Sequence, residues 1–285
     1  MRRLIVNADD FGLTAGVNCA IIEGNHSGIV TSATLMANAK ATDAAVDLAR
    51  TQPSLKTGCH VVLIDGVPLA SNLPSLTDGS PRFRSSLKQF ALAATRGQIA
   101  ADEIQREVEA QIRKLQSCGV TITHVDSHKH THMFPCVLRP MLRAAKACGI
   151  RAVRNPFEPL KSWPAGMVLG SPGLWLRLAG VMGFQIFAAE FRRALKEEGM
   201  VSTDGTVGIA VTGMLDQKRL LRILEALPEG TWELVCHPGY SDPDLQAAGT
   251  RLTQSREVEL SALTSAETKK ALARRQIDLI SYADL

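Results

Sequence analysis

Short apolar segments typical of strands alternate with amphipathic segments typical of helices along most of the chain. The first pair is the apolar run Leu4–Val6 followed by the amphipathic stretch 17–25. Strands separated by helices are joined by right-handed crossovers and pair in parallel. The alternation continues with strand-like runs at 29–36, 57–63, 121–125, 151–153, 232–236 and 277–281, and helix-like runs at 41–50, 104–115, 137–147, 220–227 and 269–273.

This alternation predicts an α/β fold. About seven strand and helix units favour a closed or nearly closed barrel over an open doubly wound sheet. No glycine-rich nucleotide-binding motif follows the first strand. We therefore expect an irregular (β/α) barrel, similar to a TIM barrel, that forms a single domain over residues 1–285. An apolar segment at about 157–200 interrupts the alternation in the manner of an insertion.

Charge and cysteine content exclude several classes of protein. The 32 basic and 28 acidic residues are spread along the chain and leave a net charge of +4, without the basic stripe that nucleic-acid binding needs. The six cysteines form no CxxC pair, which is typical of reduced thiols. The apolar run at the start is too short for a signal peptide. The longest weakly charged stretch, 178–189, is shorter than the roughly 20 residues that span a bilayer. We expect a cytoplasmic protein with no nucleic-acid partner.

Two adjacent carboxylates, Asp9 and Asp10, follow the first apolar run. In a parallel barrel the carboxyl ends of the strands form the face that carries active sites. A cation relieves the repulsion between neighbouring carboxylates, so that one can bind a metal while the other acts as a base. The same pair can instead cap the next helix or form the turn before Gly12. Taken alone, the pair leaves both interpretations open.

The segment 123–132 concentrates five aspartate and histidine residues in ten positions, in a chain with only seven histidines. If the segment is extended, Asp126, His128, His130 and His132 lie on one face. Imidazoles on that face can bind a metal while Asp126 orients one of them. The competing interpretation is a solvated polar loop.

Two further histidines, His60 and His237, lie at the ends of predicted strands. An isolated histidine in an apolar strand is usually a buried core residue. A barrel, however, brings the strand ends together, so that these histidines meet the aspartate pair and the segment 123–132 on one face. One aspartate and two histidines with an open coordination position form a hydrolytic metal site rather than a closed structural one.

These motifs resemble those of the YdjC/ChbG family of carbohydrate deacetylases. The matching segments are 6–12, 58–60, 123–132 and 236–238, and the similarity extends to 263–265 and 282–284. The resemblance implies an irregular (β/α) barrel, one divalent metal ion held by Asp10, His60 and His128, and Asp9 as the catalytic base. It implies a hydrolase that removes the acetyl group from an N-acetylated amino sugar.

The segment 157–200 resembles the branch of this family that is associated with hopanoid biosynthesis. That resemblance implies a lipid-linked substrate, an N-acetylglucosaminyl group on a hopanoid polyol such as bacteriohopanetetrol. An exposed apolar helix within 174–191 suits such a substrate and peripheral contact with the inner face of the membrane. A buried helix or a homodimer interface explains the same segment equally well.

Acetamide hydrolysis of this kind needs a metal, a base and an acid. We expect a divalent ion, Zn or Mg, to activate water and polarise the carbonyl, Asp9 to accept the proton from water, and His237 to protonate the departing amine. The developing oxyanion is expected to meet the metal and either Arg154 or a backbone N–H. The residues expected to orient these groups or to contact substrate are Asn7, Asp126, His130, His132 and Arg154.

Three alternatives stay open on the sequence. A deacetylase of chito-oligosaccharides such as diacetylchitobiose would carry the same site residues. Another metal hydrolase, such as a deaminase or phosphoesterase, usually has a His-x-His pair at the first strand, whereas here His128 and His130 lie in mid-chain. A non-catalytic sugar- or lipid-binding protein would tolerate loss of the base, yet every expected catalytic position is present.

Overall fold

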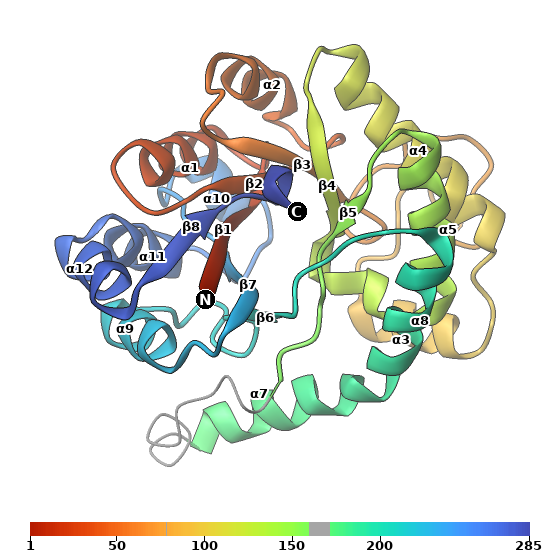
Figure 1. The fold of residues 1–285 in the computed structure, drawn as a ribbon. Helices are drawn as coiled ribbons and strands as arrows, with labels where there is room; N and C mark the ends of the chain where they lie inside the picture. Colours follow the sequence, from red (N-terminus) through yellow and green to blue (C-terminus); the bar gives the residue numbers. More distant parts are fainter. Residues whose placement is uncertain (78, 160–171) are drawn as a thin grey trace.

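The computed structural model describes residues 1–77, 79–159 and 172–285, and a curved parallel β-sheet lies at its centre (Figure 1). The strands follow the order β5, β4, β3, β2, β1, β7 and β6, with β8 also paired to β1. Each of these pairings is parallel. The bounds are β1 Arg2–Phe11, β2 Ser32–Leu35, β3 Lys56–Val61, β4 Ile122–Ser127, β5 Ala152–Val153, β6 Gly205–Val207, β7 Gly230–Cys236 and β8 Ile277–Ile280.

The long first strand, β1, organises the sheet because it pairs along both of its edges. One edge pairs with β7 over residues 2–8, while the other pairs with β8 at its start and with β2 from Asn7 onward. Backbone hydrogen bonds bridge the regions around β5 and β6: the Val153 N–H donates to the Val201 carbonyl and the Thr206 N–H to the Phe157 carbonyl, both at 3.1 Å. The sheet is therefore a curled half-barrel in a single domain, which confirms the predicted α/β fold class similar to a TIM barrel.

Helices lie around the outside of the curved sheet (Figure 1). Several begin at a side chain that accepts a hydrogen bond from the first turn, as Thr14, Asp216 and Ser265 do. The α-helices are α1 Ala15–His26, α2 Thr42–Thr51, α3 Leu87–Thr95, α4 Ala101–Ser117, α5 Pro135–Ala147, α7 Pro172–Gly183, α8 Ala188–Glu198, α9 Gln217–Ala226, α10 Pro243–Ala247, α11 Ser255–Thr264 and α12 Ala266–Arg275. Short 3-10 helices are η1 His128–Met133, η3 Phe184–Phe187 and η4 Tyr282–Asp284.

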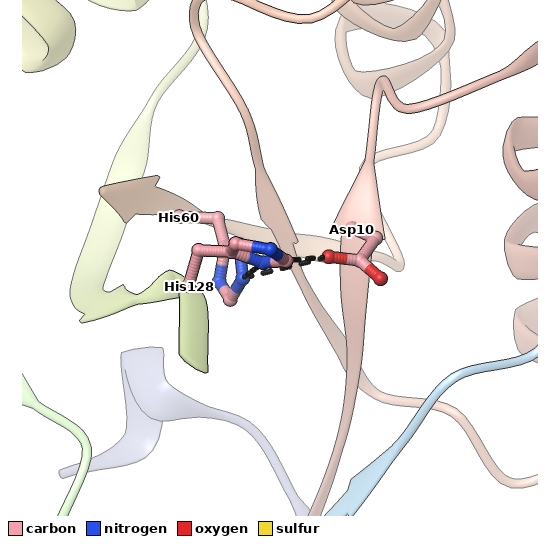
Figure 2. Close-up of side chains that lie close together, drawn as sticks. All are labelled: Asp10, His60 and His128. Atoms are coloured by element: carbon pink, nitrogen blue, oxygen red, sulfur yellow. Dashed lines mark hydrogen bonds and ion pairs between the residues drawn. The ribbon is translucent and has the colours of Figure 1, made fainter. Parts of the chain in front are cut away.

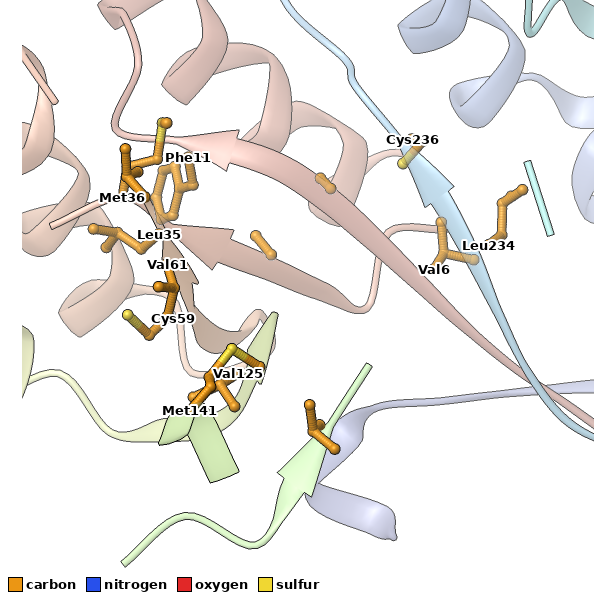
Figure 3. Close-up of a cluster of buried hydrophobic side chains, with 14 of the residues drawn as sticks. Val6, Phe11, Leu35, Met36, Cys59, Val61, Val125, Met141, Leu234 and Cys236 are labelled. Carbon is orange, nitrogen blue, oxygen red and sulfur yellow. The ribbon is translucent and has the colours of Figure 1, made fainter. Parts of the chain in front are cut away.

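Alternation of side chains along the strands separates an apolar outer layer from a polar interior. Val6, Cys59, Val125 and Leu234 belong to the buried hydrophobic cluster that also includes helix residues (Figure 3). Their neighbours along the strands point the other way, into the barrel. The buried polar side chains there include Asn7, Asp9, His60, His124, Asp126, Arg154 and Glu233. Apolar contacts thus hold the barrel from outside, while its interior combines charged and polar groups with a small apolar cluster of Ile5, Ala152 and Tyr282.

The apolar segment predicted at 157–200 is only partly described, because residues 160–171 lie outside the described part of the chain. The remainder includes α7, η3 and α8, and three buried side chains of α7 and α8, those of Leu174, Leu178 and Phe191, pack on the core. Ile186 on η3 is 75% exposed. Over the described ranges, no helix has both the length and the apolar character needed to cross a bilayer.

The long loop between β3 and α3 is fastened to α4 by buried polar side chains. Glu107 accepts hydrogen bonds from the backbone N–H groups of Leu69 and Ala70 at 2.8 to 3.1 Å. One turn further along α4, Gln111 accepts from the Val62 N–H at 2.9 Å and donates to the Val62 carbonyl at 2.7 Å. The loop therefore has a fixed course where it leaves the carboxyl end of β3.

We expect Glu107→Ala to lower the free energy of unfolding by about 2 kcal/mol, because two loop N–H groups lose their acceptor. The amides of Leu69 and Ala70 should also exchange faster with deuterium. Chemical denaturation and hydrogen exchange measure these effects. Glu109→Ala is the control, because Glu109 lies on the same helix and bonds to Gln105 instead. Equal effects from the two variants would contradict the anchoring role of Glu107.

Candidate metal and catalytic site

Three side chains from separate strand ends converge at the carboxyl edge of the sheet (Figure 2). Asp10 Oδ1 lies 3.6 Å from His60 Nε2 and 3.2 Å from His128 Nδ1, and these two nitrogens are 3.3 Å apart. Ligand atoms about 2.0 to 2.2 Å from one ion stand about 3.0 to 3.5 Å from one another, so the triangle has the size of one face of a metal site. Asp10 Oδ1 is also buried and makes no hydrogen bond to any described residue. Both the distances and the donor set fit a divalent ion.

The backbone at the end of β1 turns sharply at Asp10. The φ angle of Asp10 is +66°, in the left-handed region that non-glycine residues adopt only seldom. Gly12 has a φ angle of +94°, and a Cβ there would lie 3.3 Å from the Met36 carbonyl oxygen. Backbone strain such as that at Asp10 is typical of functional sites, and the positive φ angle at position 12 explains the glycine there.

His60 is oriented by a carboxylate behind it. Its Nδ1 lies 2.7 Å from Asp126 Oδ1, and the Thr34 hydroxyl donates to the other Asp126 oxygen at 3.1 Å. This arrangement leaves Nε2 pointing toward Asp10, as in metal sites where a carboxylate orients the ligating histidine. Burial alone would lower the pKa of His60, but Asp126, with Asp9 and Asp10, raises it to about 9. The surroundings of His60 therefore favour a positive charge.

Asp9 is fixed by a buried arginine that follows β5. Arg154 binds both Asp9 oxygens, at 2.6 Å through Nη2 and 2.9 Å through Nη1, and Asn7 donates to Oδ1 at 3.0 Å. Burial alone would raise the pKa of Asp9, but the Arg154 charge outweighs burial and holds the pKa well below its usual range. Asp9 is therefore a carboxylate at neutral pH, as a proton acceptor must be.

Arg154 is enclosed by carboxylates, whereas the sequence placed it or a backbone N–H beside the oxyanion. Its guanidinium is fully buried and, besides Asp9, contacts Asp126 at 2.5 Å and Glu233 at 2.7 Å. Three of its N–H groups donate hydrogen bonds to Asp9 and Glu233, and Asp126 lies within ion-pair distance of Nη1. Arg154 therefore orients the carboxylates around the site instead of contacting the substrate.

His237 follows β7 and lies next to Asp9. Its backbone N–H donates to Glu259 at 2.7 Å, and its Nε2 lies 3.8 Å from Asp9 Oδ2. Burial, partly offset by Asp9 and Asp10, lowers the pKa of His237 to about 4. The imidazole is therefore neutral at pH 7 and can protonate a leaving group only after it has received a proton.

The histidine-rich segment is not extended beyond β4. This strand ends at Ser127, η1 begins at His128, and Lys129 and His130 within η1 have positive φ angles of 55° and 53°. The condition under which Asp126, His128, His130 and His132 would share one face, an extended segment, is therefore not met. Asp126 and His128 reach the site. His132 is buried with its Nδ1 2.6 Å from the Ser127 hydroxyl, and His130 lines a neighbouring pocket.

Comparison with known proteins agrees with this geometry. A family model described as YdjC-like protein matches residues 3–274. The chain belongs to the YdjC-like family. Relatives named carbohydrate deacetylase include one from Brevibacillus brevis, 33% identical with 99% of both chains covered. Another, from Geobacillus stearothermophilus, is 34% identical, with 99% of this chain and 98% of the relative covered.

Solved structures share the fold of this YdjC-like protein. A protein of Enterococcus faecalis, provisionally named a cellobiose-phosphate cleavage protein, superposes with a TM-score of 0.79 at 25% identity, covering 99% of this chain and 98% of that one. A lactam utilization protein of Thermus thermophilus gives a TM-score of 0.51 at 14% identity, covering 98% of this chain and 99% of that one. This second likeness shows the fold alone.

Several residues around the site of this protein lie outside the sequence motifs. Thr34 was detectable by position, because it lies near the end of the strand predicted at 29–36. The position of Arg256 could not be inferred in this way, because its helix was not predicted from the alternation of apolar and polar segments. Arg256 also contacts Asp10 across 246 residues of sequence. The residues around the site that the sequence analysis did not name are Thr34, Glu233, Arg256 and Glu259.

In the metal-free YdjC-like protein, we expect a divalent ion to compete with a proton at His60. Because the pKa of His60 is raised to about 9, the group is protonated below that pH and must lose its proton before Nε2 can bind the ion. The apparent affinity for Zn²⁺ should therefore weaken about tenfold for each pH unit below 9. Calorimetric titration in buffers of different ionisation enthalpy measures the affinity and the protons released. An affinity independent of pH would contradict this expectation.

Proposed function

We propose that this protein is a metal-dependent hydrolase that removes the acetyl group from an N-acetylated amino sugar. The observation that carries the proposal is the triangle formed by ligand atoms of Asp10, His60 and His128, with Asp9 and His237 beside it. Relatives named carbohydrate deacetylase, 33% and 34% identical over almost the whole chain, support a carbohydrate substrate. A non-catalytic binding protein would have no need for a carboxylate kept ionised by a buried arginine.

Asp10, His60 and His128 would hold one divalent ion. When bound, such an ion lowers the pKa of a water molecule and polarises the acetamide carbonyl. Two histidines and one carboxylate accept Zn, Mg and other divalent ions, so the donor set alone does not select between them. Asp126 keeps His60 in the tautomer with its proton on Nδ1, which leaves the Nε2 lone pair for the ion.

Asp9 and His237 would carry the proton from water to the leaving amine. Asp9 Oδ2 accepts a proton from the attacking water as the new C–O bond forms at the acetyl carbon. The neutral His237 then takes this proton at Nε2, which lies 3.8 Å from Asp9 Oδ2. It donates the proton to the sugar nitrogen as the C–N bond breaks. The products are the free amino sugar and acetic acid, which loses its proton to solvent to give acetate, and Asp9 and His237 return to their starting states.

A pocket of ≈ 310 Å³ beside the site supports a finer proposal about the substrate. It adjoins the proposed metal site because Lys129 and His130, which directly follow His128, form part of its wall. We infer that the pocket receives the apolar part of a lipid-linked sugar, such as N-acetylglucosaminyl bacteriohopanetetrol. A chito-oligosaccharide, which is polar throughout, would match this lining poorly. The apolar wall comes from α3, α7, η3 and the end of η1 with the residue that follows it, and includes Leu87, Ala91, Met133, Phe134, Val181 and Phe184.

Exposed apolar side chains on the elements around this pocket fit the same proposal. Leu87 and Leu92 on α3 are 39% and 49% exposed, and Ile186 on η3 is 75% exposed. Peripheral contact with the inner face of a membrane would cover these side chains and bring a lipid-linked sugar within reach.

Acetate release tests the reaction and the choice of substrate together. We expect the purified protein to release acetate from N-acetylglucosaminyl bacteriohopanetetrol faster than from diacetylchitobiose, and to release none after treatment with a chelator. Higher activity on diacetylchitobiose would favour the chito-oligosaccharide alternative. No acetate from any N-acetylated sugar, with metal present, would contradict the deacetylase function.

Replacing Asp9 and replacing Asp10 should have different effects on turnover and on metal binding. Asp9→Asn should reduce kcat by about 10²- to 10⁴-fold while metal still binds, because only the proton acceptor is lost. Asp10→Asn should instead weaken metal binding itself. Metal content and acetate release, measured on the same samples, separate these effects. Asp47→Asn, at a position 80% exposed on α2, is the matched control and should change neither.

A further inference from the structure

A second buried arginine reaches the site from α11. Arg256 has no solvent exposure, and its Nη2 donates to Asp10 Oδ2 at 2.5 Å. Its Nε donates to the Leu252 carbonyl at 3.0 Å, which fixes the course of the side chain. Removing one member of a buried charge pair lowers the stability of a protein strongly. A fully buried arginine beside Asp10 therefore indicates a structural or functional role.

The contact with Arg256 gives the two carboxylate oxygens of Asp10 different surroundings. Arg256 holds Oδ2, while Oδ1 faces His60 and His128 at 3.6 and 3.2 Å and has no hydrogen-bond partner among the described residues. A carboxylate whose oxygens are both free can turn, and it can bind a metal through one oxygen or through both. A guanidinium on one oxygen removes that freedom.

We propose that Arg256 is a positioning residue that presents Asp10 to the metal through Oδ1 alone. This inference rests on the proposed metal-dependent function, because it assigns a role toward the same ion. Coordination by one oxygen leaves room in the metal's coordination shell for water and for the substrate carbonyl, which a catalytic site needs.

The side chain of Arg256 packs directly against Gly239. A Cβ at Gly239 would lie 2.8 Å from Arg256 Cδ, 3.3 Å from Arg256 Cβ and 3.1 Å from Val17 Cγ2, so any larger residue would displace the middle of the arginine side chain. One turn further along α11, Glu259 accepts the backbone N–H of His237 at 2.7 Å. The helix thus supports the metal ligand and the proton donor together.

Cobalt binding by the full-length protein tests this role without any substrate. The metal-free protein and its Arg256→Met, Arg256→Lys and Gly239→Ala variants are titrated with Co²⁺, and the affinity and visible spectrum are recorded. Arg256→Met should weaken binding by about 10- to 100-fold. Its cobalt bands should become weaker, because a released Oδ2 raises the coordination number. Arg256→Lys, which keeps the charge, should lose less.

Gly239→Ala keeps the arginine but moves it, so it should shift the affinity and the spectrum in the same direction as Arg256→Met. Gly183→Ala is the matched control, because a Cβ there meets nothing within 4 Å, and it should behave as the parent protein does. Thermal melting shows whether each variant is folded. If Arg256→Met does not fold, Arg256→Lys and Gly239→Ala decide the question.

Parent-like cobalt affinity and spectra in the folded variants would overturn the proposal. The same readouts decide it even if no N-acetylated sugar is hydrolysed, because they do not depend on turnover. Failure of the deacetylase function and failure of the positioning role can therefore be told apart.

Discussion

The arrangement of this site depends on one fully buried guanidinium. Arg154 lies inside the barrel between carboxylates from three strands, Asp9, Asp126 and Glu233, and contacts each of them within 2.7 Å. Losing one partner of such a buried charge network typically costs about 3 to 5 kcal/mol, because the remaining charges cannot reach water. The interior can therefore carry acidic groups only as long as Arg154 neutralises them, and the positions of those groups set the position of the site.

The aspartate pair shows how two adjacent residues acquire different roles. Both side chains are buried, and each is held by its own arginine: Asp9 by Arg154, which follows β5, and Asp10 by Arg256 on α11. A metal ion is therefore not the only cation that relieves the repulsion between them. Because the two arginines hold them separately, Asp9 is kept as a proton acceptor while Asp10 turns one free oxygen toward the histidines. The raised pKa of His60 reflects the same excess of negative charge, which favours a cation at this place.

Much of this could be predicted from the sequence, because the relevant signals are local. Alternating strand and helix patterns predicted the barrel, and strand-end positions drew attention to Asp10, His60 and His128, which the structure brings together. The course of segment 128–133 could not be predicted, because positive φ angles at non-glycine residues leave little trace in the pattern of polar and apolar residues. Partners such as Arg256 were also missed, since a contact over 246 residues depends on the final packing of α11 against the barrel.

Anomalous diffraction from a crystal soaked in Zn²⁺ shows whether side chains at three strand ends hold one catalytic ion. We expect a single strong anomalous peak about 2.0 to 2.2 Å from Asp10 Oδ1, His60 Nε2 and His128 Nδ1, with Asp9 beside it but not coordinated. A peak at another group of residues, or a triangle of these three side chains that stays empty while zinc binds elsewhere, would contradict the proposed site.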